Sequence, residues 1–258
     1  MADTFLQIWP LILLGDLARY VIGAGVVFLA VSVWWGRALA ARRIQLRCPM
    51  PADVKREITY SLLTVVIFSF VGYGMLLGVR GGALRVYGAI SDYGWLWWAL
   101  SIGVLIVAHD TYFYWTHRLL HHPRVFRWAH RTHHLSHTPT PWAAYAFAPA
   151  EAVVQAVYLP LILLVVPAHG SVIFVFVTHM ILRNAIGHCG VELMPRGVLR
   201  WLRWQPITAV THHDLHHSTV RWNFGLYFTW WDRLMGTEHP DYPERLATVL
   251  SAERAARE

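Results

Sequence analysis

The sequence is poor in charged residues and in cysteine. Charged residues make up 14% of the 258 positions, against about 25% in an average soluble domain. This scarcity excludes a disordered chain, a coiled coil and a nucleic-acid-binding tail, and it argues against an ordinary soluble enzyme. Two cysteines, Cys48 and Cys189, are too few for a disulfide scaffold or a cysteine-based zinc module.

Lysine is almost absent, since Lys55 is the only lysine among the 22 basic residues. The net charge is +7, the hydrophobic share is 56% and the mean hydropathy is +0.38. In so apolar a chain a basic excess indicates topology across a membrane, and we expect no nucleic-acid partner. The preference for arginine favours a GC-rich bacterial gene, and with it the inner membrane of a bacterium.

Two uncharged stretches in the first third of the chain predict membrane helices. Residues 58–79 carry no charge and match the roughly 20 residues that cross the hydrocarbon core. Residues 20–35 are also uncharged, and this helix extends back toward Phe5 if Asp16 and Arg19 pair across one turn. The first ten residues include no basic residue, so we expect no cleavable signal peptide and a first span that acts as its own insertion signal.

Two further apolar stretches complete the predicted bundle. Residues 93–109 open with a tryptophan-rich segment typical of a membrane interface. Residues 152–182 contain no Asp, Glu, Lys or Arg, and the segment Pro167–Gly170 divides them into two helices that either cross fully or dip in and return. The sequence therefore predicts an all-α, multi-pass bundle of about four to five membrane helices.

The connecting loops predict the orientation. The loop at 37–57 is rich in basic residues: Arg37, Arg42, Arg43, Arg47, Lys55 and Arg56. Only Arg80 and Arg85 lie between the second and third spans, so the positive-inside rule puts the 37–57 loop in the cytoplasm. Residues after about 110 and residues 183–258 then lie on the same side. We expect three parts: N-terminal membrane helices (1–92), a catalytic domain (93–240) and a C-terminal tail (241–258).

Histidine is unusually abundant, with 16 residues. The dense clusters are His117, His121 and His122; His130, His133 and His134; and His212, His213, His216 and His217. Spacings of three and four place side chains on one helix face, whereas adjacent residues diverge by about 100°. Two H-x-x-H-H triplets and an H-x-x-x-H pair therefore favour a dinuclear metal site on the cytoplasmic face over a mononuclear one.

The residues between the histidines exclude two common kinds of metal site. Imidazole suits zinc, copper, iron and nickel. The H-E-x-x-H motif of zinc proteases and the Glu-x-x-His motif of soluble di-iron bundles do not occur in these clusters. A histidine-rich di-iron site at a membrane face remains.

Five motifs resemble the fatty acid hydroxylase superfamily, also called the sterol desaturase family. They are HDTYFYWTHRLLHH at 109–122, HRTHHLSHTPTPWAA at 130–144, NAIGHCGVEL at 184–193, THHDLHHSTVRWNFG at 211–225 and WDRLMGT at 231–237. Together they cover about half of the chain. Two positions depart from related sequences: a histidine often precedes the proline where this chain has Ala148, and Asn184 stands where some relatives have a second histidine.

The resemblance implies a non-haem oxygenase with two iron ions that uses O2 to hydroxylate a C–H bond of a lipid. It implies nine iron ligands: His117, His121, His130, His133, His134, His188, His213, His216 and His217. The roles of His109, His122, His137 and His212 stay open. With no cytochrome b5-like segment in the chain, we expect a separate electron carrier of the ferredoxin or cytochrome b5 type and its reductase.

Each ligand imidazole needs a partner for its second ring nitrogen. Asp110, Asn184 and Asp214 are the candidate catalytic residues, and Glu192 and Asn223 are further candidates for orienting the ligands. Three alternatives stay open: a lipid desaturase or a carotenoid hydroxylase or ketolase with the same site, a membrane cytochrome with bis-histidine haem, and a non-catalytic metal-binding membrane protein.

Overall fold

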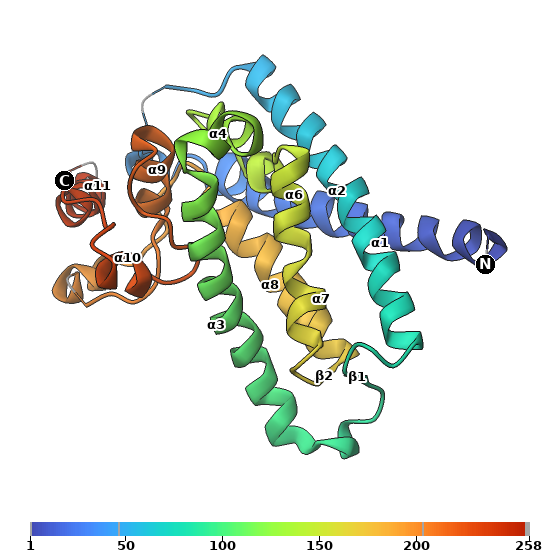
Figure 1. The fold of residues 1–258 in the computed structure, drawn as a ribbon. Helices are drawn as coiled ribbons and strands as arrows, with labels where there is room; N and C mark the ends of the chain where they lie inside the picture. The colour runs from blue at the N-terminus through green and yellow to red at the C-terminus, as the bar shows by residue number, and fades with distance from the viewer. Residues whose placement is uncertain (1, 46, 203, 256–258) are drawn as a thin grey trace.

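The computed structural model describes residues 2–45, 47–202 and 204–255 (Figure 1). Its long helices are α1 (Ala2–Phe28), α2 (Pro51–Arg80), α3 (Gly94–Leu120), α8 (Gly170–Gly187) and α11 (Tyr242–Ala255). Its short helices are α4 (Pro123–Ala129), α5 (Arg131–His134), α6 (Pro149–Ala156), α7 (Tyr158–Leu163), α9 (Val210–Thr219) and α10 (Trp230–Leu234). A π-helical segment, η1 (Leu29–Trp34), continues α1, and four 3-10 segments are η2 (Ala40–Arg42), η3 (Ile90–Asp92), η4 (Pro141–Tyr145) and η5 (Arg196–Trp201).

Four helices are long and apolar enough to cross a membrane, and they confirm the predicted multi-pass, all-α architecture. They cover Thr4–Trp34, Pro51–Arg80, Gly94–Leu120 and Gly170–Gly187, and a shorter apolar stretch covers Pro149–Leu163. The first helix begins well before residue 20. Asp16 and Arg19 form the expected ion pair across one turn, which neutralises both charges and lets the helix extend.

The predicted division of residues 152–182 into two helices is also confirmed. The first begins at Pro149 and runs through α6 and α7, and the second is α8. Between them β2 (Ala168–His169) pairs in parallel with β1 (Val86–Tyr87). The indole of Trp97 donates to the Pro167 carbonyl at 3.0 Å. The α7–α8 connection is therefore tied to the start of α3, at the lower end of the bundle in Figure 1.

The helices pack around apolar cores, one of which includes Tyr20, Val65 and Ile181 and another Leu105, Tyr158 and Phe176. α1 packs against α2, α8 and η4, and α3 packs against α8. Gly23 allows the close approach of α1 and α8, because a Cβ there would lie 2.8 Å from Cγ1 of Ile181. In Figure 1 α4 and α9 lie far from β1 and β2, so α3 spans the distance between the sheet end and the histidine end.

Candidate metal centre

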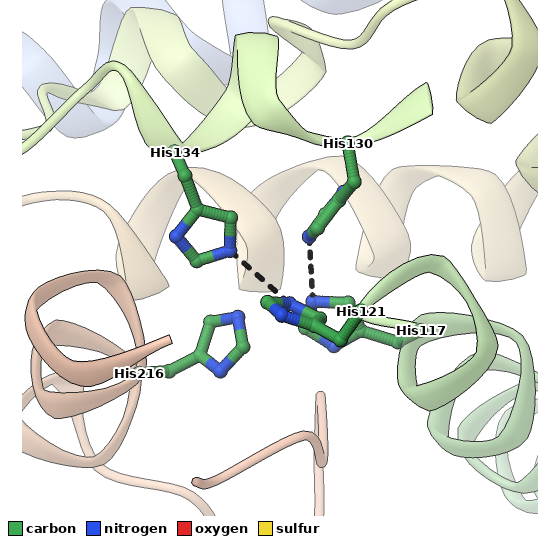
Figure 2. Close-up of side chains that lie close together, drawn as sticks. All are labelled: His117, His121, His130, His134 and His216. Atoms are coloured by element: carbon green, nitrogen blue, oxygen red, sulfur yellow. Dashed lines mark hydrogen bonds between the residues drawn. The ribbon is translucent and has the colours of Figure 1, made fainter. Parts of the chain in front are cut away.

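Nine histidines from four separate stretches of chain converge in two groups. The five-histidine group consists of His117, His121, His130, His134 and His216, and the four-histidine group consists of His133, His188, His213 and His217. The ligand atoms of each group lie within 4.8 Å of one another. Figure 2 shows the rings of the five-histidine group pointing toward a common centre from α3, α9 and the segment that holds α5. All nine residues that the sequence predicts as ligands are in these groups.

Helical spacing explains which histidines share a group. His213 and His217 are one turn apart on α9 and belong to the same group, whereas His216 belongs to the other. His133 and His134, which are adjacent on α5, also divide between the groups. The two groups are neighbours, because the ring centroids of His134 and His217 lie 4.9 Å apart. This is the arrangement that adjacent histidines diverging by about 100° were expected to produce.

The ring nitrogens within each group are as close as nitrogens that share a metal. In the five-histidine group Nε2 of His117 lies 3.0 Å from Nε2 of His130, and the Nε2 atoms of His121 and His134 are 3.2 Å apart (Figure 2). A metal that binds imidazole nitrogens at about 2.1 Å and at right angles holds them about 3 Å apart.

The four-histidine group is equally compact. Nε2 of His188 lies 3.0 Å from that of His213, 3.2 Å from that of His217 and 3.3 Å from that of His133. His188 is therefore the shared neighbour of the other three rings.

Backbone carbonyls fix the orientation of three rings. Nδ1 of His117 donates to the carbonyl of Phe224 at 2.9 Å, and Nδ1 of His188 donates to the carbonyl of Asn184 at 2.7 Å. Nδ1 of His216 donates to the carbonyl of Trp222 at 2.7 Å. Because a carbonyl only accepts, each Nδ1 carries the proton and each Nε2 presents its lone pair.

The lone pairs require an electron acceptor. Nε2 of His216 is buried and has no hydrogen-bond partner among the described residues. Since an unpaired buried acceptor is costly, a cation between the rings would satisfy it. The donor set therefore fits two metal ions bound mainly by imidazole.

Burial keeps these imidazoles neutral. It lowers the pKa of His134 to about 3 and that of His188 to about 4, and it holds the pKa of His133, His213 and His217 well below the usual value. Neighbouring histidines lower the pKa of the last three further. Metal ions bind the neutral ring, so the burial prepares the site at neutral pH.

Glu151 is a site residue that the sequence analysis missed. It lies in the first turn of α6, and its Oε2 is 2.8 Å from Nδ1 of His130. A carboxylate in this position fixes the ring of a metal ligand and raises its basicity. The signal was available, because Glu151 is the one acidic residue in the apolar helix α6, at the edge of the uncharged 152–182 stretch.

The loop after α9 is held in place by Asp232. Its carboxylate accepts hydrogen bonds from the backbone N–H groups of Phe224 and Gly225, each at 2.8 Å, and from the hydroxyl of Thr237 at 2.8 Å. Only glycine fits at 225, because a Cβ would lie 2.4 Å from the carbonyl oxygen of Phe228. The WDRLMGT motif thus secures the backbone whose carbonyl orients His117.

Glu192 and Asn223 anchor α9 rather than a ligand ring. Glu192 Oε2 accepts from the backbone N–H of Thr211 at 2.9 Å and from its hydroxyl at 2.6 Å, so it satisfies the N-terminal turn of α9. Asn223 has a φ of 60°, and its amide donates to the carbonyl of His212 at 2.9 Å. Both residues fix the helix that carries His213, His216 and His217.

The three candidate catalytic residues lie near the histidines but bond elsewhere. Asp110 accepts hydrogen bonds from the backbone N–H of Tyr227 at 2.7 Å and the indole of Trp230 at 2.9 Å. The side-chain amide of Asn184 donates to the carbonyl of Ala144 at 2.5 Å. Asn184 contributes to the site through its backbone carbonyl, described above.

Asp214 faces away from the two groups. Its Oδ1 accepts from the amide of Gln45 at 2.6 Å, and burial raises its pKa to about 6. This contact joins α9 to the basic loop that follows α1.

The four histidines with open roles lie outside both groups. Nδ1 of His109 is 2.9 Å from the hydroxyl of Tyr227, and the exposed His122 caps α4. His137 is exposed, and its carbonyl accepts from the amide of Gln45 at 2.8 Å. His212 is buried, with Nε2 3.4 Å from Oδ2 of Asp232.

Sequence comparisons relate the chain to membrane lipid oxidoreductases. The sequence model described as Fatty acid hydroxylase matches residues 102–237, just over half of the chain. The chain is 36% identical over 194 residues to a Delta(7)-sterol 5(6)-desaturase, ERG3B, of Gibberella zeae, over 74% of this chain and 58% of that protein. It is 30% identical over 196 residues to the human lathosterol oxidase, over 72% of this chain and 61% of that protein.

A third relative is methylsterol monooxygenase 1 of Rattus norvegicus, 31% identical over 132 residues, which are 51% of this chain and 44% of that protein. The chain therefore spans only about half to two thirds of the length of these relatives. No solved structure matches.

Proposed function

This chain belongs to the fatty acid hydroxylase family, and we propose that it is a di-iron oxygenase that oxidises a C–H bond of a lipid with O2. The protein is an integral membrane protein by its four apolar helices. The observation that carries the proposal is the convergence of nine buried imidazoles in two adjacent groups. We also propose that residues 93–240 form the catalytic part of the chain.

The nine histidines would hold two iron ions, which supply the activation of O2 that protein side chains cannot. Phe224, Trp222 and Asn184 keep their carbonyls on Nδ1 of three ligands, so the lone pairs stay directed inward. Burial excludes water from the rings and keeps them neutral. Glu151 takes the same orienting role toward His130.

The second candidate function is desaturation of the lipid in place of hydroxylation. Two of the relatives are named a Delta(7)-sterol 5(6)-desaturase and a lathosterol oxidase, and a third is named a monooxygenase. These names favour a lipid substrate, sterols included, and they support desaturation as the alternative to hydroxylation. A carotenoid hydroxylase or ketolase with the same metal site is a further alternative within this proposal.

The purified chain tests the proposal directly. We expect two irons per chain by elemental analysis, and consumption of O2 when a reduced electron carrier and lipid are added. Mass spectrometry of lipid extracts from expressing and non-expressing cells separates the products, because hydroxylation adds 16 mass units and desaturation removes 2. A protein without iron, or one that holds iron and oxidises no lipid, would refute the proposal. A Soret band would instead indicate haem.

The surface beside the histidines suits a negatively charged electron carrier. Arg124 and Arg127 on α4 and Arg131 on α5 are exposed on the segment that connects the first two histidine clusters. Such a basic patch attracts an acidic ferredoxin or cytochrome b5-type protein through long-range electrostatics. We propose that the donor is a separate protein with its own reductase.

We further propose that the metal centre faces the cytoplasm, as the basic 37–57 loop predicts. The location in a bacterial inner membrane stays a prediction, because the relatives named above come from a fungus and mammals. A tag fused to the C-terminus tests the orientation. It should resist external protease in intact cells, and cleavage there would overturn the topology.

A further inference from the structure

An apolar chamber lies inside the bundle, between α1, α2, α6, α7 and α8. Its volume is about 210 Å³, and most of its wall is apolar, including Phe68, Met75 and Phe176. The polar side chains in its wall include Asp16, Arg19 and Gln155. Polar groups at this depth are expensive in a membrane protein and mark binding sites or transport routes.

Gln155 lacks a partner inside this chamber. Its side chain is 9% exposed, and its Nε2 is buried without a hydrogen bond among the described residues. A buried amide N–H without a partner is costly to the folded state. A ligand that supplies one oxygen would remove this cost.

The charges in the wall indicate which oxygen fits. Asp16 and Arg19 form an ion pair, so the chamber offers a donor and an acceptor with no net charge. Because the pair has no net charge, it offers no net attraction that would offset the cost of burying a carboxylate ligand, whereas a neutral hydroxyl can donate to Asp16 and accept from Arg19 or Gln155. The wall therefore matches an alcohol better than an acid.

A larger groove lies beside this chamber, with exposed apolar side chains in its wall. It has a volume of about 590 Å³ and lies between α1 and α8, within the range of roughly 300–1,000 Å³ typical of small-molecule sites. Arg19 and Val177 line both the groove and the chamber. Ile22 and Phe174, which are 63% and 67% exposed, form part of its outer wall. The groove and the chamber are therefore neighbours that share part of their walls.

Contacts lead from the inner side of the chamber toward each histidine group. Gln155 lies one turn after Glu151 on α6, and such residues share a helix face. Glu151 in turn contacts His130 at 2.8 Å.

Aromatic contacts lead from the chamber to the other group. The ring of Phe68 lies 5.1 Å from that of Tyr145, and Phe147 lies 6.2 Å from Tyr145 and 5.4 Å from His133. Two aromatic rings therefore separate the chamber wall from the four-histidine group.

We propose that this chamber binds the hydroxyl end of an apolar lipid alcohol, with Gln155 and the Asp16–Arg19 pair as its polar contacts and the α1–α8 groove as its entrance. The inference rests on the proposed lipid oxidation, since it names the substrate class of the same site. It assigns the hydroxyl end of the lipid to the part of the chamber nearest α6.

Photolabelling of the as-purified full chain in phosphatidylcholine nanodiscs, under argon to prevent turnover, tests this proposal. The probes are a diazirine-bearing sterol, its methyl ether and a diazirine-bearing fatty alcohol, and the labelled residues are mapped by mass spectrometry. We expect saturable labelling of chamber residues such as Met75 by an alcohol, and at least tenfold weaker competition by the methyl ether. Comparison of the sterol probe with the fatty alcohol probe shows which of these two kinds of lipid alcohol the chamber binds.

Gln155→Leu is the decisive variant, because it removes only an amide that has no protein partner. We expect apparent affinity for the alcohol to fall about tenfold, and the unfolding temperature to stay equal or rise. Thr59→Val is the matched control outside the chamber and the groove, because the Thr59 hydroxyl already donates to the Lys55 carbonyl at 2.8 Å. It should retain wild-type labelling.

Non-saturable labelling of Phe174 and other exposed residues alone, or equal affinity in Gln155→Leu, would overturn the chamber proposal by indicating ordinary bilayer lipid. These outcomes differ from failure of the proposed function. A chain with two irons and lipid oxidation but no chamber labelling would sink only the present inference. Saturable labelling without iron or O2 consumption would sink only the oxygenase.

Discussion

His130 and Glu151 form a buried contact, with Nδ1 of the imidazole 2.8 Å from Oε2 of the carboxylate and side chains that are 1% and 2% exposed. The two residues come from different segments, since His130 precedes α5 and Glu151 lies in the first turn of α6. The contact therefore joins α6 to the five-histidine group, and it places a carboxyl group beside one ligand ring.

Replacing Glu151 should weaken metal binding. Glu151→Leu removes the carboxyl group that lies 2.8 Å from His130 Nδ1, and loss of a group that orients a ligand ring lowers metal affinity by about 10–100-fold. Glu151→Gln retains an oxygen acceptor and should restore most of the affinity. Iron content and competition with a chelator measure both variants. Glu238→Gln, in a partly exposed ion pair with Arg233, is the control, and equal iron affinity in Glu151→Leu and wild type would contradict the orienting role.

Removing one histidine from either group should abolish turnover. His133→Ala takes a ring from the four-histidine group and His216→Ala takes one from the five-histidine group. We expect iron to fall from two per chain to one or none in each variant, measured by elemental analysis. His122→Ala and His239→Ala remove histidines outside both groups and should keep the metal. Full iron content in the first two variants would disprove the ligand assignment.

The loop that orients His117 should depend on Asp232. In Asp232→Asn the side chain can no longer accept from all of its donors at Phe224, Gly225 and Thr237. Each buried donor without a partner costs about 1–3 kcal/mol, so the unfolding temperature and iron content should both fall. Asp241→Asn, at an exposed position, is the control and should leave both quantities unchanged. An unchanged unfolding temperature in Asp232→Asn would show that the loop is held by other contacts.

Acid should destabilise the iron-free protein. Burial lowers the pKa of His134 to about 3 and that of His188 to about 4, whereas an unfolded histidine has a pKa of about 6.5. Above that value both states are neutral and the full stability is present. As pH falls below it, the unfolded state binds more protons, so stability is lost. Unfolding temperatures of chelator-treated protein should decline from pH 7 to pH 5, and a flat profile would argue against neutral buried rings.

Local sequence pattern accounts for much of this architecture. An uncharged stretch such as 58–79 must be a helix in a membrane, because every backbone polar group has to be satisfied within the segment. The Asp16–Arg19 pairing followed from their spacing alone. The division of adjacent histidines between two groups was likewise implied by their spacing, since helical geometry separates His133 from His134.

Tertiary structure decided what the spacing could not. Helical periodicity relates residues within one element, but it says nothing about which distant backbone atom meets a side chain. The sequence suggested side chains such as Asp110, Asn184 and Asp214 as partners that orient the ligand rings. In the structure, the backbone carbonyls of Phe224 and Trp222 orient two of these rings.

The sequence by itself determined that the chain spans a membrane and that its histidines fall into two sets, because hydrophobic length and helical spacing are local properties. Only the folded chain brought Glu151 to His130 and left Gln155 without a partner in the apolar chamber. Both results depend on how α6 packs beside the other helices, and that packing is a property of many side chains together.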